Sequence, residues 1–272
     1  MKNKNIILVI AILFLYVLYI LYILFINFSS KKNIKILNFV LYSDNTSYYR
    51  KMYHLTNKHY KKYKNVDTIY YVFSENIKDT YQYDKQKNIL YIKGKETFLP
   101  GILQKTIKAF EYVPYLGKNY DYIVRTNIST IVNFDKLSKE LIKDPVDYGG
   151  PRTTLITLEW RDEKSGIKDD RYKGIRFISG ICIIFSKELF QKLLQKVNLF
   201  NYNVIDDVSI AEFIKKHLTE YKPKVFNREK YIQTTEDNFK KINVDNYIVF
   251  RNKTINNRDK DNEIIEYITN KL

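Results

Sequence analysis

One short stretch, DYIVRTNIST at residues 121–130, joins a strand pattern to a polar end. Its apolar part, Tyr122 to Val124, is made of residues that favour strands. The polar run RTNIS at residues 125–129 follows without a glycine or proline. Many α/β proteins build their sites from polar side chains at strand ends, so this stretch is the first candidate for chemistry. The alternative is an ordinary surface loop.

A second candidate is the acidic pair Asp206–Asp207 in NVIDDVSIAEF, which stands just before an amphipathic helix pattern. Acids in the first turn of a helix favourably meet the positive end of its dipole, so one interpretation is a helix cap. A carboxylate in a pocket can instead act as a general base. The residues alone leave both interpretations open, and each can hold for a different member of the pair.

The charge of the chain bears on its partners. Of 272 residues, 45% are hydrophobic, which is enough for a sizeable core, and the net charge is +16. Such a charge is compatible with binding to nucleic acid or to an anionic membrane. However, Lys, Asn, Ile and Tyr are abundant together, and all four have AT-rich codons, so a biased genome can explain the excess of lysine. The lysines are also scattered, without an arginine-rich tract. We therefore expect a weakly basic surface and no nucleic-acid partner.

Cysteine and histidine offer little chemistry. Cys182 is the only cysteine and lies in the apolar run ISGICIIFS, so we expect it to be buried, without an intramolecular disulfide. His54 and His59 are five positions apart, which turns them away from each other on a helix. A zinc site is therefore not expected.

The N-terminus carries a long apolar run. Ile6 to Ile26 gives 21 residues without a charge, a proline or a polar amide, which is long enough to span a bilayer as a helix. The exit, NFSSKKNIK, lacks a signal-peptidase pattern, so an uncleaved anchor is favoured. We expect residues 1–29 to form a short tail and a transmembrane anchor, and residues 30–272 to form the catalytic domain. Lysines stand on both sides of the run. We expect a single-pass membrane protein with its domain on the non-cytosolic side.

The rest of the chain alternates between strand and helix patterns, which predicts one α/β domain with a largely parallel sheet. Strand patterns occupy residues 33–43, 66–74, 88–93, 121–130, 175–186 and the start of 245–261. Helix patterns occupy residues 48–63, 99–113, 136–142, 187–200, 203–218 and 262–272.

The order of these segments resembles the membrane-anchored glycosyltransferases of the glycosyltransferase-A fold, in particular the galactosyltransferase and Fringe-like group. The resemblance covers roughly residues 35–260. The family's first strand and helix are matched by VLYSDNTSYYRKM, and its K-x-D-D-D strand by YIVRTNIST. Further matches are a Lys-Thr pair, a Gly-to-Ser segment and an acidic pair followed by Val, which here are Lys105–Thr106, Gly180–Ser186 and Asp206–Asp207–Val208.

This resemblance implies a Rossmann-like mixed sheet flanked by helices. It also implies transfer of a sugar, as by a hexosyltransferase, from a nucleotide-sugar donor of the UDP-sugar type to a glycan or protein acceptor. One rival is an inactive member of the fold that serves as a membrane-tethered binding or structural protein. Another is a basic, anchored protein that binds anions or nucleic acid, against which the scattered charges count.

The family's aspartates would hold a divalent cation, Mn²⁺ or Mg²⁺, that bridges the donor diphosphate. In register, this chain has Asn127, Ile128 and Ser129. Alternation along a strand places Asn127 and Ser129 toward the donor pocket and Ile128 on the other side. Amide and hydroxyl oxygens are ligands for hard cations, but without formal charge they hold them less firmly. Either the metal is bound weakly or cations of the protein replace it.

The resemblance also assigns roles to other residues. Asp207 matches the base that receives the acceptor proton, and Asp206 would position it. Compensation of the charge on the departing diphosphate falls to basic residues, because a guanidinium grips a phosphate with two hydrogen bonds. The residues expected to bind the donor are Arg50, Lys105, Arg125, Thr126, Asn127 and Arg251, with Arg258 close to the last of these. Trp160 and Tyr172 either stack on an acceptor sugar or pack in the core.

Overall fold

The computed structural model describes residues 13–22 and 33–272, except residues 158, 227 and 255–256. The chain divides into two compact units, Met1–Ile34 and Lys35–Leu272. In the first unit, residues 13–22 are helical. Among the described residues, no helix has the length and apolar character needed to cross a membrane. The predicted span at residues 6–26 lies partly outside the described residues, and the predicted boundary at residues 29–30 lies wholly outside them.

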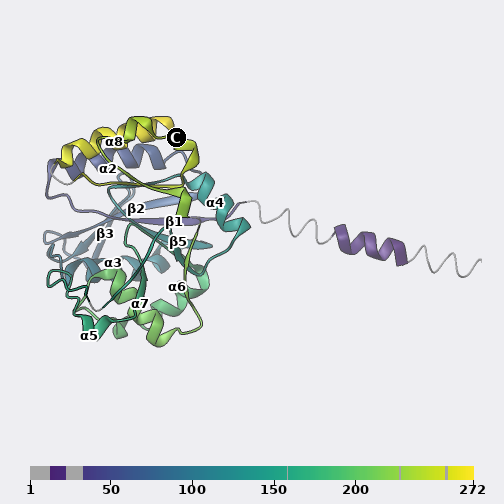
Figure 1. Ribbon diagram of the computed structural model, residues 1–272, viewed down its shortest axis with the longest axis horizontal. Coiled ribbons are helices and arrows are strands. Elements are labelled where there is room, and N and C mark those ends of the chain that lie inside the picture. Colours follow the sequence, from purple (N-terminus) through teal and green to yellow (C-terminus); the bar gives the residue numbers. More distant parts are fainter. Residues whose placement is uncertain (1–12, 23–32, 158, 227, 255–256) are drawn as a thin grey trace, which may run out of the picture. The chain divides into compact units, whose positions relative to one another are not determined.

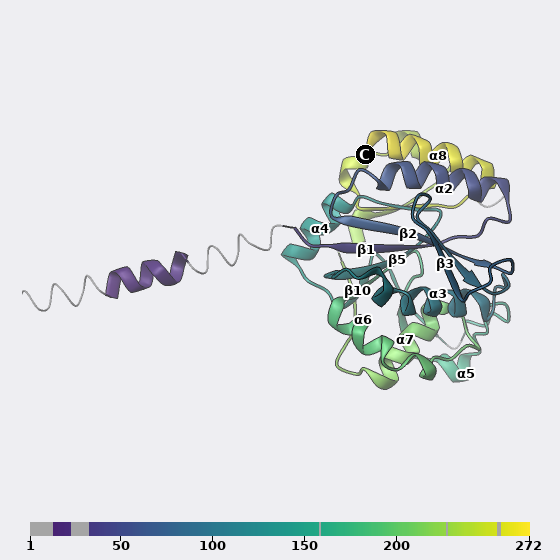
Figure 2. The ribbon, with the colours of Figure 1, turned by 180° about the vertical axis from the view of Figure 1, so that it is seen from behind.

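The second unit is a mixed α/β domain built on an eight-stranded sheet (Figures 1 and 2). The order across the sheet is β11-β7-β10-β5-β1-β2-β4-β3. The strands are β1 (Ile36–Leu41), β2 (Val66–Ser74), β3 (Tyr81–Asp84), β4 (Ile89–Lys93), β5 (Tyr122–Asn127), β7 (Tyr148–Gly150), β10 (Cys182–Ser186) and β11 (Pro223–Val225).

The four central strands β5, β1, β2 and β4 run parallel to one another. On either side the direction reverses, because β10 pairs antiparallel with β5 and β3 pairs antiparallel with β4. The predicted α/β domain with a mixed sheet flanked by helices is therefore confirmed, while the largely parallel sheet holds only for its centre. The short connection between β3 and β4 permits only an antiparallel hairpin.

Two small sheets complete the domain. One has the order β12-β13-β6 and the other pairs β8 with β9. The strands are β6 (Thr130–Val132), β8 (Thr153–Leu155), β9 (Arg176–Ile178), β12 (Tyr231–Thr234) and β13 (Val249–Asn252). The single strand predicted over residues 175–186 is therefore wrong. β9 and β10 belong to different sheets, because the chain turns between them with a hydrogen bond from the Cys182 N–H to the Ser179 carbonyl.

Helices cover both faces of the large sheet. α2 and α8 lie side by side on one face, and α3, α6 and α7 lie on the other (Figures 1 and 2). The helices are α2 (Ser47–Tyr60), α3 (Gly101–Glu111), α4 (Phe134–Lys143), α5 (Asp169–Tyr172), α6 (Lys187–Leu194), α7 (Asp206–His217) and α8 (Arg258–Lys271). Short 3₁₀ segments occur at Val113–Leu116, Val197–Leu199, Arg228–Lys230, Phe239–Lys241 and Val244–Asn246.

The helices begin where the sequence supplies caps. The side chains of Thr46, Asn133 and Ser186 each accept a backbone N–H from three residues further on, at the starts of α2, α4 and α6. Such a bond satisfies one of the N–H groups that a helix start leaves without a partner. α7 begins differently, because its N-cap position is Ile205, which has no side chain able to accept. The first turn of α7 instead carries the two aspartates.

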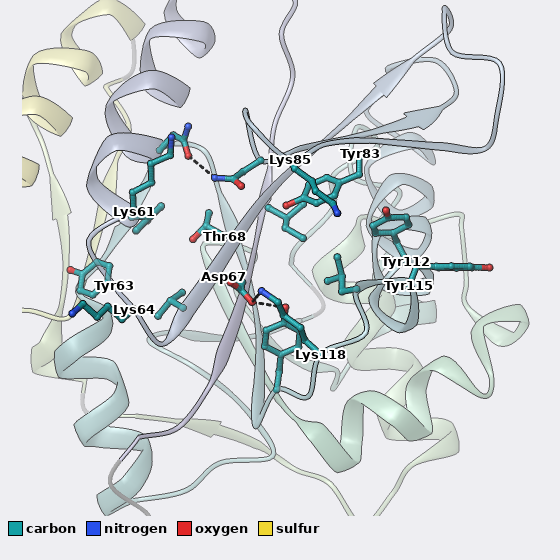
Figure 3. A pocket seen from close by; sticks show the side chains of 17 residues that line it. Lys61, Tyr63, Lys64, Asp67, Thr68, Tyr83, Lys85, Tyr112, Tyr115 and Lys118 are labelled. Carbon is teal, nitrogen blue, oxygen red and sulfur yellow. Dashed lines mark hydrogen bonds and ion pairs between the residues drawn. The ribbon is translucent and has the colours of Figure 1, made fainter.

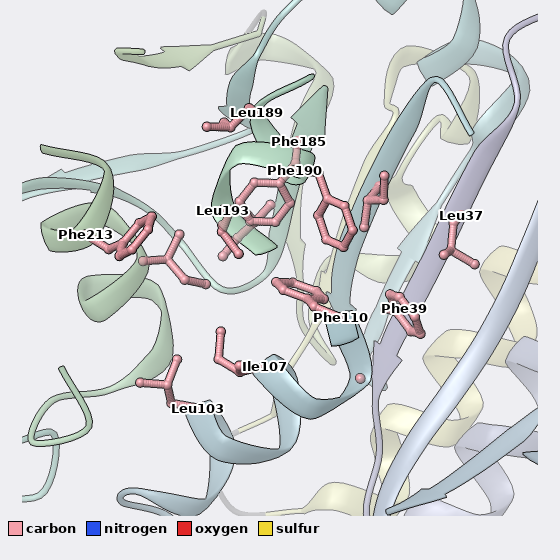
Figure 4. Packing of buried hydrophobic residues seen from close by; sticks show 14 of the residues in the cluster. Leu37, Phe39, Leu103, Ile107, Phe110, Phe185, Leu189, Phe190, Leu193 and Phe213 are labelled. Carbon is pink, nitrogen blue, oxygen red and sulfur yellow. The ribbon is translucent and has the colours of Figure 1, made fainter. Parts of the chain in front are cut away.

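The main core lies between the large sheet and the layer of α3, α6 and α7 (Figure 4). Phe110 of α3 is at its centre, with ring centroids 6.0 Å from Phe39 of β1, 5.6 Å from Phe185 of β10 and 5.1 Å from Phe190 of α6. Burial of one such side chain contributes roughly 1.5–3 kcal/mol. This packing holds α3 and α7 against the carboxyl ends of β1 and β5, where the polar residues gather.

Candidate functional site

The carboxyl ends of the parallel strands open into a cleft of about 520 Å³. β1 and β5 are neighbours in register, so Leu41 lies beside Asn127 and both strands stop at the same edge. A smaller hollow of about 230 Å³ adjoins the cleft. Leu41, Phe98 and Arg251 line both, so the two spaces are continuous. Ligands of open α/β sheets bind at this edge.

Arg125 forms the buried base of the hollow. Its side chain is 1% exposed, and its Nη2 makes an ion pair with Asp206. Its Nη1 donates to the Asn127 Oδ1 at 2.8 Å and to the Gly180 carbonyl. Burial alone acts to lower the pKa of Arg125, but Asp206 raises it and the net shift is upward. Arg125 therefore stays charged and ties β5 to the first turn of α7.

Asp207, the neighbour of Asp206, points into the same hollow. Its Oδ2 accepts the Gly180 N–H at 3.0 Å, and its Oδ1 accepts the Val208 N–H at 2.9 Å. Burial raises the pKa of Asp207 to about 7, and the negative charge of Asp206 adds to the shift. The bond to Val208 satisfies a helix-start N–H, so Asp207 caps α7. A carboxyl that titrates near neutral pH is also suited to proton transfer.

Gly180 is the position that lets these groups approach. A Cβ there would lie 2.9 Å from the Arg125 Nη1 and 3.4 Å from the Asp207 Oδ2. The first distance is shorter than real side chains tolerate, and Arg125 is held by three partners and has little room to shift. In the segment Gly180–Ser186, the missing side chain of Gly180 therefore allows its backbone to contact both Arg125 and Asp207.

Arg251 of β13 provides a cation on the wall shared by the cleft and the hollow. Its Nη1 donates to the Ser129 Oγ at 2.6 Å and to the Thr130 Oγ1 at 3.4 Å. Burial lowers the pKa of Arg251 to about 10, and the nearby charge of Arg258 contributes. In the part of the chain that the structure describes, no carboxylate lies within 4 Å of Arg251. It is a partly exposed cation that forms no ion pair with the described residues.

The other cations of the cleft differ in their partners. Lys105 of α3 is 1% exposed and donates to the Tyr42 carbonyl at 2.8 Å and to the Glu96 Oε1 at 2.5 Å. Burial lowers the pKa of Lys105, against the opposing effect of Glu96. Arg258 pairs with the buried Asp261 at 2.5 Å. Lys253 lines the cleft with an exposed side chain and has no carboxylate within 4 Å among the described residues.

Most of the predicted site residues lie at this edge of the sheet. The residues that line the cleft or the hollow are Lys105, Arg125, Asn127, Ser129, Asp206, Asp207 and Arg251. Two others do not line it. Thr126 is fully buried on the opposite face of β5 and donates its hydroxyl to the Asn38 Oδ1 at 3.0 Å, because side chains alternate along a strand. Arg50 is exposed and donates to the Asp44 carbonyl at 2.5 Å.

The predicted register beyond Asn127 is only partly right. Asn127 and Ser129 both line the cleft, but so does Ile128, which was expected on the other side. The reason is that β5 ends at Asn127, and Ile128 and Ser129 form a turn before β6 begins. Strand alternation therefore does not extend through this stretch.

Some cleft residues carried no signal that singled them out in the sequence. Glu96 pairs with Lys105 and also accepts the Phe73 N–H at 3.2 Å, so it joins α3 to the end of β2. Phe98 and Tyr49 provide apolar walls. The only available signal was their position, since Glu96 and Phe98 lie in the polar connection that follows β4 at the edge where ligands bind.

The two oxygens proposed as metal ligands do not fit a divalent cation. The Asn127 Oδ1 already accepts from Arg125, and the Ser129 Oγ already accepts from Arg251. Like unit charges 4 Å apart repel by about 4 kcal/mol at an effective dielectric constant of about 20, and a divalent ion doubles this. Among the described residues, no group of three or more His, Cys, Asp or Glu is placed to hold a metal.

A second pocket, of about 530 Å³, lies beside the amino half of β2 (Figure 3). β4 pairs with Tyr70–Ser74 of β2, and Val66–Ile69 border the pocket. Its acid, Asp67, accepts from the Lys118 Nζ at 2.9 Å and from the Tyr120 hydroxyl at 2.7 Å. Tyrosines form much of its wall, and its lysines all have exposed side chains: Lys61, Lys64, Lys85 and Lys118.

The two aromatic residues considered for an acceptor sugar pack against other side chains. Tyr172 is fully buried in a small core near α7, and its hydroxyl accepts from the Asn201 Nδ2 at 3.1 Å. Trp160 is partly buried against Phe177, with ring centroids 5.6 Å apart. Core packing thus accounts for Tyr172, and Trp160 retains only a partly exposed ring.

Comparison with known proteins gives limited likenesses. No protein-family model matches the chain, and no curated protein matches it. Among solved structures, the mannosyltransferase PcManGT from Pyrobaculum calidifontis, in complex with GDP-Man and Mn²⁺, has a TM-score of 0.41 and 13% identity. The match spans 71% of this chain and only 55% of that chain, so this chain covers about half of its length.

The galactosyltransferase LgtC is similar to the same degree. Its complex with donor and acceptor sugar analogues has a TM-score of 0.42 and 12% identity, over 84% of this chain and 95% of that chain. An active-site mutant of LgtC has a TM-score of 0.43 and 12% identity, over 84% of this chain and 94% of that chain. At TM-scores below 0.5, these likenesses do not define a function for this chain.

Proposed function

We propose that this chain is a glycosyltransferase of the glycosyltransferase-A type. It transfers a sugar from a nucleotide-sugar donor, of the UDP-sugar class, to a hydroxyl of a glycan or protein acceptor. The observation that carries this proposal is Asp207. It is a buried carboxyl whose pKa is raised to about 7 by burial, in a hollow that Arg251 also lines. A base and a cation around one small space are what sugar transfer requires.

The chemistry assigns each group a step. In a single displacement, the bond from the sugar C1 to the diphosphate oxygen breaks as the bond from C1 to the acceptor oxygen forms. The acceptor proton passes to the Asp207 carboxylate, and the negative charge that develops on the diphosphate is met by the cations of the cleft. Asp206 does not need to touch substrate in this scheme. It holds Arg125, which in turn holds Gly180 and Asn127 in place.

An inactive binding protein of the same fold is a second candidate, and one observation favours it. Both oxygens of Asp207 already accept backbone N–H groups, as a purely structural cap would. Each carboxylate oxygen has a second lone-pair direction, so these bonds leave room for a proton. The two candidates therefore differ in turnover and not in whether a nucleotide binds.

We also propose that the domain is tethered to a membrane by residues 6–26 and lies on the non-cytosolic side. The support is the 21-residue apolar run in the sequence. Protease digestion of sealed microsomes that contain the tagged full-length chain tests this arrangement. The domain should be protected until detergent is added. Release of the chain by alkaline carbonate would contradict an anchor.

The test of function is a transfer assay on the full chain with a panel of nucleotide sugars, with and without Mn²⁺. Release of nucleoside diphosphate is expected from at least one UDP-sugar, and Asp207→Asn should lower the turnover number by about 10² or more with unchanged donor affinity. Asp135→Asn is the matched control, because Asp135 is an exposed acid in the first turn of α4. Nucleotide binding without turnover by the wild type would support the inactive candidate.

A further inference from the structure

The residues at the expected metal position bind arginine instead. Asn127 and Ser129 occupy the end of β5 and the turn after it. Each offers one side-chain oxygen toward the cleft, and each oxygen accepts an N–H from a different guanidinium, Arg125 or Arg251. A divalent ion at this position would have to share these oxygens with the two guanidinium groups and remain beside their positive charges.

Three carboxylates near the cleft are committed to cations, whereas the exposed Asp44, between the lining residues Ser43 and Asn45, forms no ion pair with the described residues. Glu96 pairs with Lys105, Asp206 pairs with Arg125, and Asp261 pairs with Arg258. Asp207 is left without a cation partner among the described residues, but its oxygens accept backbone N–H groups. The cleft therefore offers a metal no free pair of carboxylates.

Two cations remain without a counterion. Arg251 and Lys253 have no carboxylate within 4 Å in the described part of the chain, and both line the cleft. Arg251 lies in β13, and Lys253 follows the last residue of that strand. Arg251 is partly buried beside Ser129, and this burial lowers its pKa to about 10. A bound anion would supply the missing charge, and a phosphate oxygen pair matches the guanidinium fork.

We propose that this cleft binds the diphosphate of its donor directly through Arg251 and Lys253, with Arg258 and Lys105 nearby, and without a divalent metal. The proposal rests on the proposed function for the identity of the donor. In this arrangement Arg251 meets the diphosphate beside Ser129, a position that the family resemblance assigns to a metal ligand. Ser129 orients the guanidinium through its hydroxyl and does not act as a metal ligand.

The experiment is a calorimetric titration of the full chain with inorganic pyrophosphate and with UDP, each in EDTA and in Mn²⁺. Both probes should bind in EDTA, with dissociation constants no more than about threefold above those in Mn²⁺. Arg251→Gln should weaken both by about tenfold or more, as the loss of a charge-assisted pair predicts. Arg176→Gln is the control and should change nothing, because Arg176 is exposed on β9 and does not line the cleft.

Lys253→Gln provides a second variant, since an exposed side chain can be replaced without loss of the fold, and it should weaken binding by about threefold. Binding that requires Mn²⁺, or that is unchanged in both variants, overturns the proposal and leaves sugar transfer intact. If pyrophosphate binds in EDTA but no nucleotide sugar is consumed, the proposed function is contradicted and the metal-free anion site is supported.

Discussion

Two pockets of the domain are nearly equal in volume, at about 520 and 530 Å³, and both are lined by cations. They differ in how those cations are held. In the pocket beside β2, the lysines have exposed side chains, and Asp67 pairs with Lys118 in an open ion pair (Figure 3). At the carboxyl edge of the sheet, Arg125 is fully buried and Arg251 lacks a carboxylate within 4 Å among the described residues.

The two pockets are therefore alike in volume and in the sign of their charge, and differ in the desolvation of their cations. An exposed lysine keeps its water and costs the fold little. A buried guanidinium is costly unless it is paired, and an unpaired one persists where a ligand or a reaction makes use of it. Arg251 meets this criterion, whereas Arg125 and Arg258 are paired and the lysines beside β2 are exposed.

The largest expected effect comes from breaking one ion pair in each pocket. Asp206→Asn leaves the buried Arg125 without its counterion and should lower the free energy of unfolding by about 3–5 kcal/mol. Asp67→Asn breaks the exposed pair with Lys118 and should cost about 1 kcal/mol or less. Urea denaturation of both variants measures the difference. Equal losses would contradict the distinction between the pockets.

The next effect is the contribution of Asp207 to the pH dependence of stability. Outside the cleft, the buried His59 contributes a slope of the opposite sign, because burial lowers its pKa to about 4. The pKa of Asp207 is about 7 in the folded chain against 3.8 for the free carboxyl, so the folded state holds the extra proton between these values. Stability should therefore fall as the pH rises from 4 to 7, by on the order of 1 kcal/mol per pH unit from this group.

Asp207→Asn should flatten this slope. The slopes are compared and not the absolute stabilities, because an asparagine has one acceptor oxygen for two backbone N–H groups. Denaturation midpoints at several pH values give the answer. An unchanged slope in the variant would show that Asp207 does not titrate in this range.

A smaller effect should follow from filling the space at Gly180. Gly180→Ala places a Cβ about 2.9 Å from the Arg125 Nη1, so the guanidinium must move away from Asn127 or Asp206. Overpacking of this kind costs about 1–3 kcal/mol. Gly149→Ala is the control, because its added Cβ meets side-chain and backbone atoms at similar distances, 2.9–3.1 Å, away from the site. Gly174→Ala is unsuitable, because its backbone φ of +75° would itself strain an alanine. Only Gly180→Ala should also weaken pyrophosphate binding, measured by calorimetry.

The smallest effect separates an arginine site from a metal site most sharply. Ser129→Asp introduces a carboxylate beside Arg251, which should pair with it and weaken pyrophosphate binding in EDTA by about tenfold, or about 1.4 kcal/mol. If the position were a metal site, the same change should strengthen binding and make it depend on Mn²⁺. The titration in both buffers distinguishes these outcomes.

Local patterns predicted much of the fold from the sequence. The strand expected over residues 66–74 is β2, Val66–Ser74, because its β-branched and aromatic residues form a buried strand of ordinary length. The strand expected over residues 175–186 is two strands, because the chain turns at residues 179–181, where the Ser179 carbonyl accepts the Cys182 N–H.

The site was less predictable, because its contacts join distant parts of the chain. Arg125 and Asp206 are 81 positions apart, and Arg251 and Ser129 are 122 apart, so no spacing pattern could show that they bond. The sequence predicted the strand end at Asn127, whereas Ser129 lies in the turn that follows, and no pattern could show that both side-chain oxygens accept from guanidinium groups. Thr126 was grouped with them only because it is adjacent.

The location of the nucleotide is the most direct test of the account. Amide hydrogen exchange of the full chain, measured with and without saturating UDP, compares the two pockets in one experiment. The account predicts slower exchange around residues 41–45, 127–129 and 251–253, with no change around residues 61–69 and 112–120. Protection confined to the pocket beside β2 would contradict it.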